Sequence, residues 1–237
     1  MLLIASFCYA MSIFIDVFTY HLKCNIHDNK NLRYLFSLIN IFQFSARAFV
    51  LVFIPIMAYY TETIKDIDII WNITLLAHIF VIVLLIPLYS KKFSIYVSHK
   101  IIFVLNYFLG KSKDINVLQL QDIPLEVKTT IKSKKQERLG GFYFFIIAYF
   151  SGLFFSFSIT FLYYLSFFYP QKALTLTSYS QILNMVGTLL LLLLIDPKIM
   201  SSIDSGRGHS ELKTLTSSRI LVHITLIILL YILKWWQ

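Results

Sequence analysis

Six long apolar runs constrain the fold of this chain more than any other feature. Each run has about 19 residues or more, which at ~1.5 Å per residue lets a helix cross roughly 30 Å of hydrocarbon. Hydrophobic residues make up 58% of the 237 residues, whereas a soluble domain has about 45–50%. Backbone polar groups must be paired inside a bilayer, so we predict an all-α, polytopic membrane helix bundle that forms a single transmembrane domain over residues 1–237. The expected spans are Leu2–Tyr20, Tyr34–Met57, Ile69–Tyr89, Phe142–Phe168, Leu176–Ile195 and Leu215–Leu233.

The longest connection between spans, residues 91–141, is basic and carries one further apolar segment, residues 94–109. The uninterrupted apolar part of this segment, residues 101–109, is too short to cross a bilayer. We therefore expect an interfacial helix with Lys92 and Lys100 directed toward lipid headgroups. A re-entrant hairpin is the alternative for the same residues.

Glycine and proline predict where two other helices end. Proline cannot continue a helix, so the fifth span should stop at Asp196-Pro197. Gly140-Gly141 should end a basic helix over residues 127–138. The fourth span carries small residues at every fourth position, a pattern that lets helices approach closely in lipid. These residues are Ala148, Gly152, Ser156 and Thr160.

The basic residues predict how the bundle is oriented. Most of the 21 Lys and Arg residues lie in the first, third and fifth loops or at the mouth of the last span. Cytoplasmic loops carry such an excess, so both termini should lie outside the cytoplasm and residues 91–141 inside it. The formal net charge of +9 is then explained by these loops, and we expect no nucleic-acid partner.

A polar stripe interrupts the second apolar run. Asn40, Gln43 and Arg47 are spaced i, i+3 and i+7, which places them on one helical face. An arginine facing lipid near the bilayer centre costs at least ~2.5–3.5 kcal/mol, whereas a guanidinium binds phosphate through paired hydrogen bonds. We predict that these three residues, with Asn184 and His78 at similar depth, line a midplane cavity that binds an anionic, hydroxyl-rich headgroup.

A second polar group lies nearer the cytoplasmic side of the spans. The rise per residue places Asp16 ~15 Å from the layer of Arg47, at about the depth of Arg219. One interpretation is a buried pair that only fixes helix packing. The other is a coupling or gating group, in which Asp16 responds to protons or cations through Arg219 or His223. Asp196, at the cytoplasmic end of the fifth span, is assigned to the same group.

Several sequence patterns of enzymes and metal sites are absent. The chain has no phosphate-binding loop, no H-E-x-x-H pair and no G-x-S-x-G elbow, so we expect no cofactor, no metal site and no enzymatic activity. Two alternatives remain open. One is an integral-membrane enzyme acting on lipid-linked phosphates through Asp196, Asp204, His209 and Glu211. The other is a non-transporting envelope scaffold, in which the polar faces of the second and fifth spans close on each other.

The spacing of residues near both ends resembles the alternate lipid II flippase (Amj) family. The residues that carry the resemblance are Asp16-x-x-x-Tyr20, Ser37-Leu-Ile-Asn40-Ile, Ser45-x-Arg47, Pro55, Tyr169–Ala173, Ser180-Gln-Ile-Leu-Asn184 and Asp196-Pro197. The resemblance implies a flippase that moves an undecaprenyl-diphosphate-linked glycan, such as lipid II, across the bacterial cytoplasmic membrane. Our hypothesis places the diphosphate on Arg47. Six spans are few for such a task, so we also expect a possible homodimer.

Overall fold

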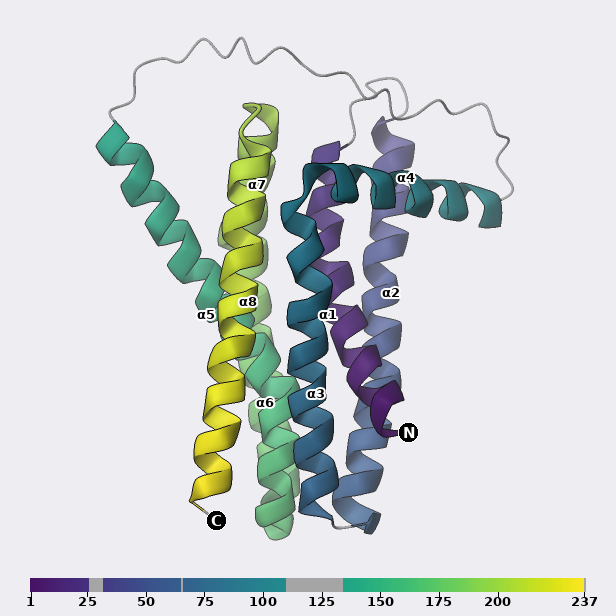
Figure 1. Cartoon of the computed structure of the whole chain (residues 1–237), viewed down its shortest axis with the longest axis vertical. Helices are drawn as coiled ribbons and strands as arrows, with labels where there is room; N and C mark the ends of the chain where they lie inside the picture. The colour runs from purple at the N-terminus through teal and green to yellow at the C-terminus, as the bar shows by residue number, and fades with distance from the viewer. Residues whose placement is uncertain (26–31, 65, 110–133, 237) are drawn as a thin grey trace.

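The computed structural model describes residues 1–25, 32–64, 66–109 and 134–236, which form helices and short connections with no strand (Figure 1). Six helical segments are long and apolar enough to cross a membrane. They are Leu2–Asn25, Arg33–Thr63, Ile67–Tyr89, Gly140–Phe168, Pro170–Asp204 and Gly208–Trp235. The predicted all-α, polytopic membrane bundle with six spans is confirmed.

Each predicted span is covered by one helix together with the turn that adjoins it. The α-helices are α1 Leu2–Asn25, α2 Leu32–Tyr59, α3 Ile67–Leu85, α4 Lys91–Phe108, α5 Lys134–Phe168, α6 Ala173–Leu190, α7 Asp196–Asp204 and α8 Gly208–Trp235. Turns of 3-10 geometry cover Ile86–Tyr89 and Pro170–Lys172, and π-helical turns cover Tyr60–Ile64 and Leu191–Ile195.

Two sets of helices pack around α1 and α5. α1 packs against α2 and α3, whereas α5 packs between α6 and α8. α8 also meets α3 and α1, so it joins the two sets. The shared core contains large, fully buried side chains from several helices, including Tyr9, Phe18, Phe53, Phe161 and Leu226. The interior of the bundle is therefore closely packed around α1.

The short helix α4 lies across one end of the bundle, and both chain termini lie toward the other end (Figure 1). α4 is one continuous helix that begins three residues before the predicted segment, so the alternative of a hairpin does not hold. Asn25 at the end of α1 holds it in place. The Asn25 side-chain amide donates hydrogen bonds to Ser94 Oγ at 3.0 Å and Ser98 Oγ at 2.9 Å. The exposed residues of α4 include Lys91, Lys92 and Lys100.

Two predicted helix ends are wrong. The fifth span does not stop at Asp196-Pro197, because α6 continues through a π turn into α7 and forms one 35-residue helical segment. Pro197 lies in the first turn of α7, where the missing N–H is tolerated. α5 likewise passes through Gly140 and Gly141. Glycine in a helix interior costs only ~1 kcal/mol relative to alanine, which the remainder of a 35-residue helix outweighs. Residues 127–133 of the predicted basic helix lie outside the described residues.

Candidate functional site

Arg47 lies on the outer surface of α2, where its side chain is exposed. It is 15 residues from Leu32 and 12 from Tyr59, so by the helical rise it lies ~22 Å and ~18 Å from the two helix ends. Asn40 is also exposed, and Gln43 is half-buried. The structure therefore places the polar stripe at the rim of a single bundle, rather than inside an enclosed cavity.

Asp16 is an acidic residue whose charge interacts with Arg47 of this stripe. It is half-buried on α1, and its charge interacts with both Arg219 and Arg47. α1 runs five residues beyond its predicted end, to Asn25. This extension reduces the axial offset between Asp16 and Arg47 from the expected ~15 Å to ~9 Å by the helical rise. The charge of this one carboxylate thus interacts with guanidinium groups from both α2 and α8.

Arg219 is buried inside the bundle, with 8% of its surface exposed. Its guanidinium occupies space that Gly152 of α5 leaves free. A Cβ atom at position 152 would collide with Nη1 and would lie 3.0 Å from Cδ of Arg219. Arg219 interacts electrostatically with Asp16, Tyr20 and Tyr9, yet no ion pair or hydrogen bond within the described residues holds it. The predicted seam of small residues therefore makes room for a buried cation.

His78 does not meet Arg47 but pairs with His223. The two Nδ1 atoms are 2.9 Å apart, and both side chains are fully buried. Tyr9 of α1 approaches both rings edge-on, with centroid distances of 5.7 and 6.1 Å. Phe161 of α5 stacks on His78. The direct packing of α3 on α8 brings the two imidazoles together, so His78 belongs to the interior of the bundle.

Asn184 is likewise separated from Arg47. It lies on α6, is half-buried, and its Oδ1 atom is buried without a hydrogen-bond partner. α6 packs against α5, and it is held there by Ser151 Oγ, which donates to the carbonyl of Gly187 at 2.9 Å. Within the described residues, α6 packs mainly against α5, and α2 packs mainly against α1. The structure therefore does not bring Asn184 to the stripe on α2.

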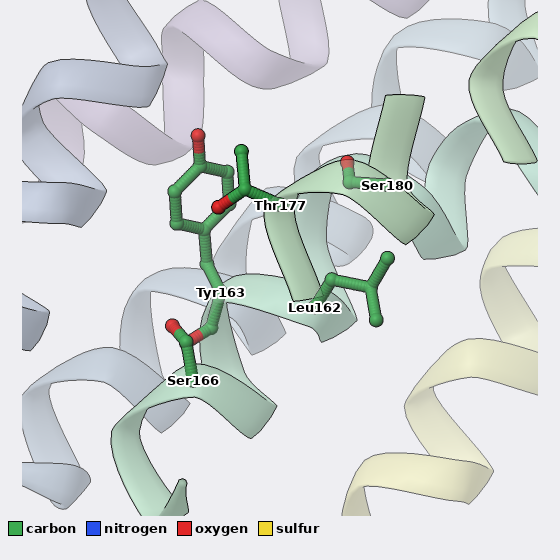
Figure 2. A pocket seen from close by; sticks show the side chains of 5 residues that line it. All are labelled: Leu162, Tyr163, Ser166, Thr177 and Ser180. Atoms are coloured by element: carbon green, nitrogen blue, oxygen red, sulfur yellow. The ribbon is translucent and has the colours of Figure 1, made fainter. Parts of the chain in front are cut away.

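A small, partly open pocket lies between α5 and α6 (Figure 2). It is lined by Leu162, Tyr163, Ser166, Thr177 and Ser180. These side chains supply hydroxyl groups and apolar surface but no charged group. The pocket has no means of neutralising an anion, and we do not assign it to the charged site.

Asp196 lies at the end of the bundle that carries α4. Its Oδ1 atom is 3.1 Å from Lys23 Nζ, and the Tyr20 hydroxyl faces the same carboxylate. Glu211, another acidic residue of this end, lies 3.7 Å from Lys198. Two of the acidic groups considered for an enzyme are therefore in ion pairs. Among the described residues, no group of three or more His, Cys, Asp or Glu residues could hold a metal ion.

Four residues that were given no site role from the sequence belong to this arrangement: Tyr9, Tyr20, Lys23 and Gly152. Three of them share a face of α1 with Asp16, because positions 9, 16, 20 and 23 are separated by seven, four and three residues. This spacing could have identified them. We call Tyr9, Asp16, Tyr20 and Lys23 the α1 polar face. The role of Gly152 in accommodating Arg219 could be identified only once the packing of α5 on α8 was known.

The fold and the charged groups define a multi-pass α-helical membrane protein with a carboxylate, two arginines and a histidine pair inside its spanning region. No protein-family model, curated protein or solved structure matches the chain.

Proposed function

We propose that this protein is a flippase that moves a polyprenyl-diphosphate-linked saccharide, such as lipid II or a related cell-envelope precursor, across the bacterial cytoplasmic membrane. One observation carries the proposal. Arg47 is exposed near the middle of a spanning helix, and Asp16, whose charge interacts with it, also interacts with Arg219. Two permanent cations thus share one anion within the spanning region.

This excess of positive charge favours an anionic ligand. Asp16 can neutralise one guanidinium at a time, and an arginine left facing lipid costs at least ~2.5–3.5 kcal/mol. A diphosphate can accept paired hydrogen bonds from Arg47. Asn40 and Gln43 lie on the same face and offer amide groups to phosphate or sugar. Because α2 is at the rim of the bundle, the prenyl chain can remain in the surrounding lipid.

Exchange of Asp16 between the two arginines offers a way to release the ligand. While Asp16 faces Arg219, Arg47 is free to hold the diphosphate. When Asp16 turns toward Arg47, it competes with the diphosphate and favours its departure. In this scheme Asp16 and Arg219 act as the gate. In this proposal His78 and Asn184 are not used for substrate binding, because His78 contacts His223 and Asn184 lies on α6, which packs mainly against α5.

The surroundings of the site also support the proposed orientation and a homodimer. The exposed lysines of α4 favour the cytoplasmic leaflet for this end of the bundle. Both termini would then lie outside the cytoplasm. An exposed Arg47 is not enclosed by its own bundle, so a second copy packed on the α2 side would complete a shared cavity around the headgroup.

The two alternatives receive less support. An enzyme acting through Asp196 and Glu211 needs carboxylates that are available to the substrate. Both form ion pairs, Asp196 with Lys23 and Glu211 with Lys198. A scaffold in which the second and fifth spans close on each other requires extensive contact between α2 and α6, whereas within the described residues α6 packs mainly against α5.

The proposal is tested with purified protein in liposomes that contain a headgroup-labelled, fluorescent undecaprenyl-diphosphate disaccharide. Dithionite added outside quenches the label only in the outer leaflet, so movement makes the protected fraction accessible. We expect Arg47→Ala to slow this movement by about 10- to 100-fold, because a lost hydrogen bond to a charged group is worth ~1.5–3 kcal/mol. Arg33→Ala, at the exposed start of the same helix, is the matched control and should behave like the wild type. Unchanged movement in Arg47→Ala refutes the proposal.

A further inference from the structure

We propose that the His78–His223 pair binds a proton and passes it through the centre of the bundle, and that this proton is coupled to the movement of the substrate. The coupling rests on the function proposed above. The proton site itself rests on the geometry of the two rings. Both are fully buried, and neither is needed to hold the diphosphate.

The contact between the rings determines their protonation state. With the Nδ1 atoms 2.9 Å apart, one ring must donate an N–H to the bare nitrogen of the other. A neutral imidazole carries one proton, so the two rings hold it on different nitrogens. Each Nε2 atom is buried without a hydrogen-bond partner. One of these atoms has a free lone pair, and the other has an unused N–H.

This arrangement can pass one proton from one ring to the other, after which the two rings have exchanged their tautomers and must reset before the next proton. A proton binds to the bare Nε2 of the donor ring, which becomes an imidazolium. The Nδ1–H bond of that ring breaks as an Nδ1–H bond forms on the partner. The partner then releases the proton from its own Nε2. One proton enters and one leaves, and the pair carries a single added charge in between.

The groups around the pair link its charge to the diphosphate site. From α1 the facing titratable group is Tyr9, from α8 it is Arg219, and from α5 Phe161 stacks on His78. The positive charge of Arg219 acts on His223 and opposes an added proton. Asp16 acts on the same arginine and relieves this opposition. Movement of Asp16 toward Arg47 would therefore favour loss of the proton.

The α1 polar face places titratable side chains between the pair and the α4 end of the bundle. Tyr9 lies beside the two imidazoles, and Asp16 and Tyr20 follow along the same face. Tyr20 faces Asp196 at that end of the bundle. The titratable groups thus extend from the centre of the bundle to the surface that carries α4.

The pair is tested first by nitrogen NMR of the full-length protein, with ¹⁵N-labelled histidine, in lipid nanodiscs. We expect His78 and His223 to carry their protons on different ring nitrogens, with a correlation between the two Nδ1 atoms that disappears in His223→Gln. Signals are assigned with the single variants His78→Gln and His223→Gln. Two rings of the same tautomer without this correlation would overturn the proton site.

Coupling is tested in the same liposomes with a pH difference across the membrane and the electrical potential clamped. If one proton moves with each labelled lipid, a difference of one pH unit should produce about a tenfold unequal distribution of the probe. His78→Gln and His223→Gln should move the probe but distribute it equally. His99→Gln, on α4 outside the pair, should resemble the wild type.

Each result has a defined meaning. Equal distribution by the wild type under the pH difference overturns the coupling, as does unequal distribution by both pair variants. If the pair variants fail to move any probe, the wild-type distribution still tests the coupling and the NMR result still tests the proton site. If the wild type itself moves no probe, the proposed flippase function fails, whereas the NMR measurement continues to judge the proton site.

Discussion

Replacement of Gly152 by alanine tests whether this glycine exists to accommodate Arg219. The added methyl group would collide with Nη1 and come within 3.0 Å of Cδ and 3.1 Å of Cζ. Overpacking of this kind costs about 1–3 kcal/mol, whereas alanine gains ~0.5–1 kcal/mol over glycine in a helix interior. We therefore expect a net destabilisation of about 1–2 kcal/mol.

The matched control is Gly141→Ala on the same helix, where nothing lies within 4 Å of the added atom. This variant should be neutral or slightly more stable than the wild type. The free energy of unfolding is measured for both variants in the same detergent micelles. A Gly152→Ala protein that is as stable as Gly141→Ala would refute the reasoning. So would destabilisation that persists fully when Arg219 is shortened to alanine in the same chain.

Two further predictions concern the α4 end of the bundle. Asn25→Ala removes the donor to Ser94 and Ser98 and should cost about 1–3 kcal/mol; faster amide hydrogen exchange confined to α4 and the end of α1 would report it, and exchange equal to the wild type would contradict it. Lys23→Met leaves the Asp196 carboxylate unpaired and should destabilise the protein by about 1 kcal/mol. Adding Asp196→Asn should restore most of that loss, and a double-mutant cycle with no coupling energy would show that the pair is not stabilising.

The number of spans was predictable because length and apolar character alone determine whether a helix can cross a bilayer. Helix ends were less predictable. The rule that proline stops a helix failed at Pro197, because a π turn places that residue at a new helix start. The depth of Asp16 relative to Arg47 was misjudged because α1 continues for five residues beyond its predicted end. These residues are too polar to be recognised as part of an apolar run.

The partners of the buried polar groups could not be predicted from one sequence. Depth along the chain grouped His78 with Arg47, but depth does not define the direction in which a helix faces. The rotation of α3 and α8 determines that His78 meets His223. Similarly, the repeat around Gly152 predicted a close approach but not an arginine as the group that approaches. Polar spacing along α1 was the one unused signal.

The attachment of α4 has a mechanical consequence. α4 is tied by hydrogen bonds to the last turn of α1, the helix that also carries Asp16. A change in bilayer thickness that displaces this surface helix would be transmitted to α1 through these hydrogen bonds. The charge balance between the two arginines is thereby exposed to the physical state of the surrounding lipid.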